Sequence, residues 1–189
     1  MVPGMDILVL PSNRVYRLCW NGQAVQCAVG RAGIVPAALK REGDGATPAG
    51  DWPLRRVLYR PDRLASPVTA LPVAPLAPED GWCDDPDHPA YNQPIKRPFS
   101  ARHEALWRAD DVYDVIVVLG YNDSPPHPGT GSAIFLHCVP SAYQPTAGCV
   151  ALVRGDLLRL LADCGPGDRL CLYTRENHSS IQPSSGVFP

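Results

Sequence analysis

Short apolar runs, many of them alternating with polar residues, occupy most of the chain, and turn-forming residues separate them. This pattern is typical of short β-strands. The clearest case is a pair of β-rich runs at 14–20 and 23–29, which flank Asn21-Gly22. An Asn-Gly pair favours the type I′ turn of a two-residue hairpin, because both turn positions need positive φ. We therefore predict a β-hairpin here.

Further apolar runs predict strands along the rest of the chain, at 7–10, 52–59, 113–119, 132–137, 149–153 and 168–173. The run 113–119 is β-branched and apolar at nearly every position, as expected for a strand buried on both faces. One helix is predicted after residue 153. Asp156 can cap its start, three leucines share one of its faces, and Gly165-Pro166 ends it.

The remaining segments are predicted to be loops. Glycine and proline mark 43–50 as a loop, and 120–131 is equally rich in turn residues. Residues 61–111 hold many of the 22 prolines and form a long, loop-rich insertion. Residues 174–189 are polar and predict a loose tail. We expect a single domain over 1–173, since no repeat or second domain is evident.

Composition narrows the possible partners. The formal net charge of −2 gives no electrostatic reason to expect nucleic acid or an anionic membrane. No apolar run is long enough for a transmembrane helix. The seven cysteines show no C-x-x-C spacing, so neither a zinc ribbon nor a redox dithiol is indicated. The sequence leaves the oligomeric state open.

Cysteine usage and the first residues predict a compartment. The segment 1–10 lacks the basic start and the long apolar stretch of a secretory signal peptide. An odd number of cysteines without such a signal favours a reducing cytoplasm. We therefore expect a cytoplasmic protein, with the periplasm or cell envelope as the alternative.

The most informative chemical feature is the pair His137 and Cys149. His137 closes one apolar run, and Cys149 follows Gly148 at the start of another. An imidazole can accept a thiol proton and leave a reactive thiolate. We would then expect His137 to lower the pKa of the Cys149 thiol. The alternative is a buried strand cysteine with a nearby core histidine.

Other candidate sites have less support. The cluster Asp84, Asp85, Asp87 and His88 lacks the spacing and the glycine of a calcium loop, so a solvated, hydrogen-bonded loop is expected. No Gly-x-Ser-x-Gly elbow indicates a serine nucleophile.

The surroundings of His137 and Cys149 resemble those of a known family. Three features occur in order: Thr47-Pro48-x-Gly50, a strand that ends in His137, and Thr146-x-Gly148-Cys149-Val150 before a helix. In this combination the sequence resembles the L,D-transpeptidase catalytic domain (YkuD domain) from about residue 6 to residue 173. The resemblance implies a mainly β fold, a curved mixed β-sandwich with one or two short helices.

This sequence departs from the family pattern at three points. Ala147 stands where a second histidine is usual, Ala151 stands where the family has arginine or asparagine, and the loop after His137 is shorter than usual. The polar residue missing at 151 helps the family bind substrate. Tyr121, Asn122, Arg154 and Arg31 are the candidates to take over that contact, and the sequence does not choose between them.

The resemblance implies cysteine-dependent acyl transfer on peptidoglycan stem peptides or muropeptides, without a metal or organic cofactor. Cys149 would be the nucleophile and His137 the base. Gly148 would belong to the oxyanion site, and Thr146 would position the turn or a bound water. Two alternatives stay open: an L,D-carboxypeptidase that trims muropeptides in the cytoplasm, and a degenerate module that binds peptidoglycan fragments or a protein.

Overall fold

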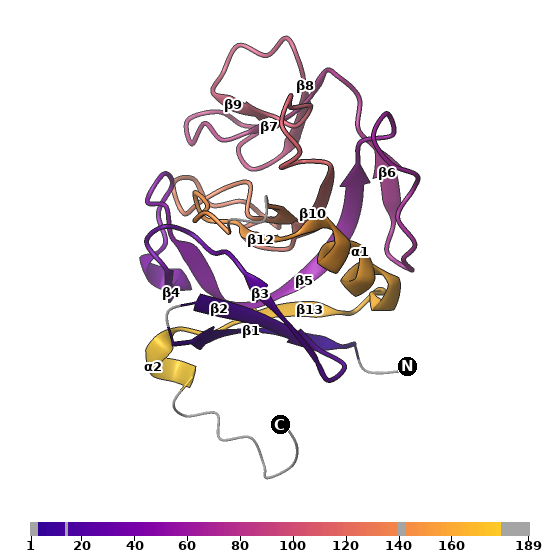
Figure 1. Ribbon diagram of the computed structural model, residues 1–189. Coiled ribbons are helices and arrows are strands. Elements are labelled where there is room, and N and C mark those ends of the chain that lie inside the picture. The colour runs from indigo at the N-terminus through magenta and orange to yellow at the C-terminus, as the bar shows by residue number, and fades with distance from the viewer. Residues whose placement is uncertain (1–3, 14, 140–142, 179–189) are drawn as a thin grey trace.

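The computed structural model describes residues 4–13, 15–139 and 143–178 of the 189-residue chain. Within these ranges the chain is mainly β (Figure 1). The strands are β1 Asp6–Ser12, β2 Val15–Trp20, β3 Gln23–Cys27, β4 Ile34–Pro36, β5 Thr47–Tyr59, β6 Val73–Pro75, β7 Asp80–Cys83, β8 Pro94–Lys96, β9 His103–Ala105, β10 Val115–Leu119, β11 Phe135–Cys138, β12 Val150–Leu152 and β13 Arg169–Leu172. The helices are α1 Arg154–Asp163, α2 Arg175–His178 and the 3₁₀ turn η1 Ala37–Leu39.

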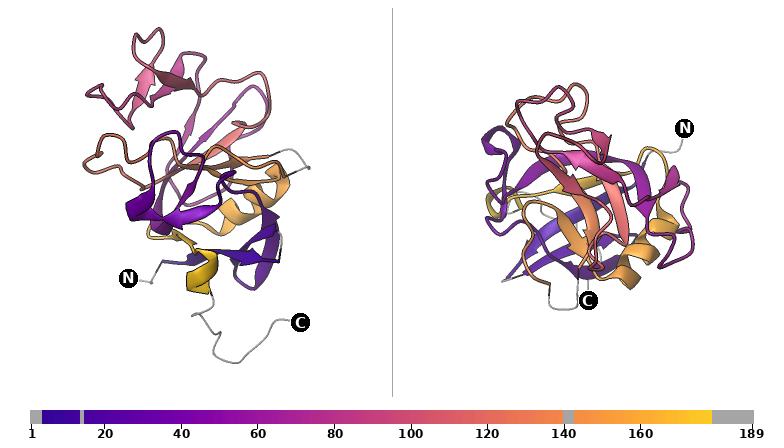
Figure 2. Two further views of the ribbon diagram at one scale, coloured as in Figure 1. Left: turned by 90° about the vertical axis from the view of Figure 1, so that its left-hand side faces the viewer. Right: turned by 90° about the horizontal axis from the view of Figure 1, so that it is seen from above.

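One curved, mixed sheet contains most of the strands, in the order β12-β11-β10-β5-β13-β1-β2-β3, with β4 and β6 also paired to β5. The two ends of this sheet approach each other. Ala28, just after β3, and Ala151 in β12 exchange two backbone hydrogen bonds of 2.9 Å. The sheet therefore nearly closes into a barrel, and its curvature is visible from above in Figure 2. The predicted mainly β class is confirmed.

A small second sheet, in the order β8-β7-β9, lies at the top of the view in Figure 1. It belongs to the insertion 61–111, which also contributes β6. The insertion thus contains four short strands that its proline content did not predict. Trp82 of β7 packs edge-on against Phe135 of β11, with ring centroids 5.1 Å apart. This contact packs the small sheet against the large one.

Two apolar clusters fill the two faces of β10 and β11. Side chains of a strand alternate between faces, so Leu136 and Cys138 join the larger cluster together with Leu157 of α1. Phe135 joins the smaller cluster with Tyr113 and Cys149. The candidate site lies against this smaller cluster, which contains Cys149 itself.

Several local predictions are confirmed. The hairpin forms with Asn21 at φ 42° and Gly22 at φ 74°, joining β2 and β3. The strands at 7–10, 52–59, 113–119, 149–153 and 168–173 are present with shifted ends. Residues 120–131 contain no helix or strand.

Four predictions need correction. Asp156 does not cap α1: the cap residue is Val153, and Asp156 lies in the first turn. The strand predicted at 132–137 begins at Phe135, because Ala133 has a φ of 51° and cannot extend it. β5 begins at Thr47, inside the predicted loop, because it pairs with β4 there. Residues 175–178 form α2, and the rest of the predicted tail, 179–189, lies outside the described residues.

No helix that the described residues form is long and apolar enough to span a membrane.

Candidate active site

A cavity of about 590 Å³ lies where β11, the 146–149 turn and the insertion meet. His137, Thr146, Gly148 and Cys149 all contribute to its wall. The structure therefore brings together the four residues that the sequence proposed as catalytic. The insertion forms part of the same wall through Asp84, His103, Glu104 and Arg108.

Strand geometry brings His137 and Cys149 to the same face of the sheet. His137 pairs with Ala151 of the parallel strand β12, and Cys149 immediately precedes that strand. The side chains of 135 and 137 point to the same face of β11. The Phe135 and Cys149 side chains belong to the same apolar cluster, so this face also holds the thiol. The Phe135 N–H donates to the Cys149 sulfur at 3.3 Å.

The His137 ring has a defined tautomer. Its Nδ1 lies 2.7 Å from the Cys138 carbonyl oxygen. A carbonyl oxygen only accepts hydrogen bonds, so Nδ1 carries the proton and Nε2 keeps its lone pair. Burial lowers the pKa of His137 to about 4, so the ring is neutral near pH 7. The edge-to-face contact with Tyr113, 5.4 Å between centroids, fixes the ring further.

The Cys149 thiol is protonated in this state. Burial, and then the negative charge of Glu104, raise the pKa of Cys149 to about 12. The thiol donates to the Ala133 carbonyl at 3.2 Å. Among the described contacts no hydrogen bond joins this thiol to the His137 ring. The expectation that His137 lowers the thiol pKa is therefore wrong for the resting protein.

Two threonine hydroxyls hold the backbone of the nucleophile turn. The Thr146 hydroxyl donates to the Cys149 carbonyl at 2.6 Å and accepts the Gly148 N–H at 3.1 Å. Thr47 reaches the same carbonyl at 3.5 Å and accepts the Gly30 N–H at 2.8 Å. Thr146 thus positions the turn. Thr47, part of the Thr-Pro-x-Gly motif, links the same carbonyl to the Gly30 backbone.

Gly148 is required by this turn. Its φ is +147°, and a Cβ placed there would lie 2.9 Å from the Ala46 carbonyl oxygen. Only glycine accepts that backbone conformation and that approach without strain. The Gly148 N–H donates to the Thr146 hydroxyl. The Cys149 N–H has no acceptor among the described residues, so it is the donor that can bind an oxyanion.

The three residues predicted to bind substrate are not part of the cavity wall. The Tyr121 hydroxyl donates to the Thr130 carbonyl, and its ring packs on Trp52. The Asn122 amide bonds the carbonyls of His127 and Gly131. Arg154 pairs with Asp114 at 2.8 Å. A substrate contact by these three stays a prediction. Arg31 does line the cavity.

Sequence reasoning missed Asn92, Tyr113 and Glu104, which shape the site. Asn92 accepts the Ala133 N–H at 3.0 Å and so fixes the carbonyl that receives the thiol. Tyr113 packs on His137 and donates to Glu104 at 2.6 Å. Asn92 is buried with a φ of 56°, a conformation that asparagine adopts more readily than most residues. No local motif marks any of the three, because their contacts with the site, such as Asn92 with Ala133 and Tyr113 with His137, join different elements of the fold.

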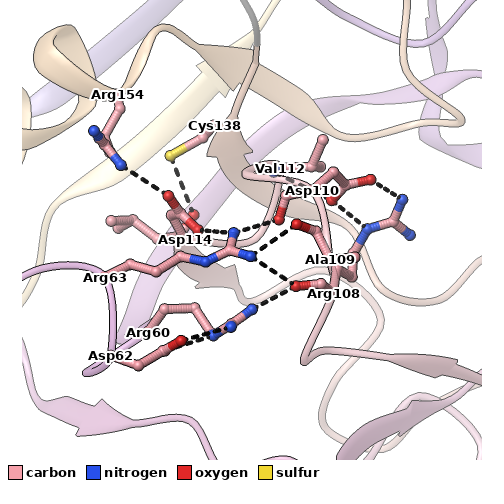
Figure 3. Close-up of polar contacts among 11 residues, drawn as sticks. Arg60, Asp62, Arg63, Arg108, Ala109, Asp110, Val112, Asp114, Cys138 and Arg154 are labelled. Carbon is pink, nitrogen blue, oxygen red and sulfur yellow. Dashed lines mark hydrogen bonds and ion pairs between the residues drawn. The ribbon is translucent and has the colours of Figure 1, made fainter.

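A network of arginines and aspartates holds the segment 108–114 against the sheet (Figure 3). Asp114 is 1% exposed and pairs with Arg63 at 2.7 Å as well as with Arg154. The Arg60 guanidinium lies 3.8 Å from the centre of the Trp107 ring. Because Tyr113 directly precedes Asp114, this network places Tyr113 over His137.

The acidic loop near the cavity is hydrogen-bonded, as predicted. Arg102 pairs with Asp84 at 3.1 Å, and Asp85 accepts the Asp87 N–H at 3.2 Å. Within the described ranges no three His, Cys, Asp or Glu side chains are grouped so as to hold a metal ion. That the chemistry needs no cofactor stays a prediction.

The fold and the cavity define a mainly β protein with a buried cysteine and a buried histidine in the wall of one cavity. The model of the L,D-transpeptidase catalytic domain (YkuD) matches residues 5–171, and the chain belongs to that family. Members of the family are L,D-transpeptidases, enzymes that act on peptidoglycan stem peptides. No curated protein matches the chain.

Two solved structures are similar to the chain at low identity. Bd1075 of Bdellovibrio bacteriovorus is 16% identical with a TM-score of 0.46, over 94% of this chain and 52% of that protein. L,D-transpeptidase 1 of Mycobacterium tuberculosis is 11% identical with a TM-score of 0.38, over 89% of this chain and 61% of that one. The chain thus spans between half and two thirds of the length of these two proteins.

Proposed function

We propose that the protein is a cysteine-dependent acyltransferase of peptidoglycan stem peptides, and that it acts through a thioester at Cys149. Family membership supports the reaction class. The observation that carries the proposal is the neutral His137 ring, protonated on Nδ1, in the same cavity wall as the Cys149 thiol. Its Nε2 is a proton acceptor of the kind that a thiol nucleophile requires.

Because the resting thiol is protonated, its proton leaves as the new bond forms. In the proposed first step the Cys149 sulfur attacks a peptide carbonyl, and His137 Nε2 takes the thiol proton. The tetrahedral oxyanion accepts the Cys149 N–H, a donor of a type worth about 3 kcal/mol in a dry site. The C–N bond then breaks, His137 protonates the leaving amine, and a thioester remains.

The thioester has two possible fates. Attack by an amine gives a new peptide bond, which is transpeptidation. Attack by water gives a free acid, which is L,D-carboxypeptidase activity on the same donor. A cytoplasmic location, as expected from the sequence, would favour the second fate, since recycled muropeptides rather than wall strands would be the substrates there.

One observation favours a second candidate function. The Cys149 thiol is bonded to the Ala133 carbonyl, and burial raises its pKa to about 12, which is a resting state without a thiolate. Together with alanines at 147 and 151, this supports a module that binds peptidoglycan fragments without turnover.

Intact-protein mass spectrometry after incubation with a disaccharide-tetrapeptide separates these functions. We expect an adduct equal to the donor minus D-alanine, located on Cys149 and absent from Cys149→Ala. Cys164→Ala is the matched control, because Cys164 is also buried but lies outside the cavity wall. His137→Gln should slow adduct formation about 10²-fold or more.

The products with and without an amine acceptor then identify the fate of the thioester. A new amide supports transpeptidation, and only free acid supports the carboxypeptidase. The enzyme proposal is contradicted if no adduct and no turnover are detected. If Cys149→Ala also binds the fragment as well as the native chain does, the binding module is favoured.

A further inference from the structure

The charged side chains of the cavity wall differ in whether they have an ionic partner. Lys40 pairs with Asp44 at 2.7 Å. Asp84 pairs with Arg102, and Arg108 pairs with Asp110 at 2.6 Å. The remaining members, Arg31, Glu42 and Glu104, form no ion pair within 4.0 Å among the described residues.

Of the two carboxylates, Glu42 is better satisfied within the protein. One of its oxygens accepts hydroxyl protons from Tyr91 and from Ser132, at 2.5 and 2.7 Å. Among the described residues, the Glu104 carboxylate, in β9, accepts a hydrogen bond only from the Tyr113 hydroxyl, on Oε1. A carboxylate has about four acceptor positions, so most of the capacity of Glu104 is unused.

Glu104 also lines the same cavity as the Cys149 nucleophile. Burial raises its pKa, which shows that its charged form is poorly solvated. Its negative charge is in turn one of the causes that raise the pKa of Cys149. Arg108 offsets part of this charge, but its guanidinium pairs with Asp110. A partly buried carboxylate that forms no ion pair of its own is costly, and a ligand cation that hydrogen-bonds to it offsets that cost.

We propose that Glu104 binds the primary ammonium group of a peptide substrate, in the cavity that Cys149 also lines. The group could belong to the acyl donor or to the amine acceptor, and the chemistry of recognition is the same. This inference rests on the proposed function for the identity of the substrate. Three observations carry the inference: the Glu104 oxygen without a hydrogen bond, the place of Glu104 in the wall with Cys149, and the absence of an ion pair to Glu104 among the described residues.

An ammonium bound there would have a second effect. It would offset the charge of Glu104, and so lower the pKa of the thiol that this charge raises. Substrate binding and formation of the nucleophile would then be coupled through one carboxylate.

Binding in a Cys149→Ala background tests this without any turnover. We expect calorimetry to show that D-alaninamide, a primary ammonium, binds at least roughly tenfold more tightly than neutral N-acetyl-D-alaninamide. Adding Glu104→Gln should abolish that preference. Glutamine keeps an oxygen that can accept the Tyr113 hydroxyl, so the cavity should stay folded, which circular dichroism checks.

Asp84→Asn is the matched control, because Asp84 is an acid of the same wall that already has an arginine partner. It should leave the preference for D-alaninamide unchanged. Glu104→Asp should retain part of that preference, even if Glu104→Gln proves unstable. Equal binding of the two amides, or an equal loss with Asp84→Asn, would overturn the inference.

Turnover by the enzyme with Cys149 intact distinguishes the two sources of the ammonium. A higher KM for the amine acceptor in Glu104→Gln, with adduct formation unchanged, places the acceptor there. Slower adduct formation with an unchanged product ratio places the donor there. Failure to form any adduct would contradict the proposed function, while the calorimetry would still decide the role of Glu104.

Discussion

His137 is suited to accept a proton because of how its ring is buried. The ring is 6% exposed, donates from Nδ1 to the Cys138 carbonyl and lies edge-on to Tyr113. These contacts leave Nε2 as the one basic nitrogen. A charged ring in this position would lose much of its hydration, which is why its pKa falls to about 4.

This low pKa predicts a specific loss of stability in mild acid. The unfolded chain binds a proton at His137 near pH 6.5, whereas the folded chain does so only near pH 4. Stability is therefore unaffected above pH 6.5 and falls as the pH drops from 6.5 to 4. The loss from this one group at pH 5 is about 2 kcal/mol.

Urea unfolding at pH 7 and pH 5 measures this effect, with His137→Asn as the comparison. The native chain should lose about 2 kcal/mol more than the variant between the two pH values. Comparing the two proteins cancels the contributions of other groups, such as Glu104, whose pKa is raised. Equal losses in the two proteins would mean that His137 is not buried as a neutral ring.

Among the elements, the turn 146–149 determines where the nucleophile lies. It connects to β12, and hydrogen bonds from Thr146 and Thr47 fix the Cys149 carbonyl. Gly148 supplies the backbone conformation that these bonds require. The position of the sulfur is thus set by backbone contacts.

Gly148→Ala should therefore lower the free energy of unfolding by about 1–3 kcal/mol, because the new Cβ meets the Ala46 carbonyl in an unfavourable backbone conformation. Gly155→Ala is the matched control. Gly155 lies in the first turn of α1 with open space around it, so alanine there should be neutral or stabilise by up to about 1 kcal/mol. Thermal or urea unfolding checks both, and a loss at 155 equal to that at 148 would contradict the argument.

Elements whose formation depends on residues close to one another in the sequence could be predicted from it. The Asn21-Gly22 hairpin and the leucine face of α1 are of this kind, and so is the apolar strand β10. The start of β5 could not be predicted, because Thr47 becomes a strand residue only by pairing with Ile34 of β4.

The site shows the same division between local and long-range features. His137, Gly148 and Cys149 form a short motif, and the sequence identified them together. Glu104 has no such motif: it reaches the cavity through the small sheet of the insertion, and its partner Tyr113 lies just after that insertion. The pKa of Cys149 also depends on burial, which only the folded chain shows.

At the scale of the whole molecule, two features hold the cavity together. The bonds between Ala28 and Ala151 close the large sheet beside the nucleophile turn. The arginine–aspartate network joins three segments that are distant in sequence: the 60–63 turn, the start of β10 and the start of α1 (Figure 3). Asp114 is the centre of this network, with one arginine on each carboxylate oxygen.

Asp114→Asn should consequently destabilise the whole fold. The carboxylate is buried while Arg63 and Arg154 are partly exposed, so the arginines can be rehydrated and the loss should be about 2–3 kcal/mol, below that of a fully buried pair. Asp6→Asn is the control, because Asp6 pairs with Arg169 at 2.7 Å on the surface and should cost under about 1 kcal/mol. Urea unfolding at pH 7 compares the two. Similar small losses would show that the network is a surface feature, and that other contacts place Tyr113 over His137.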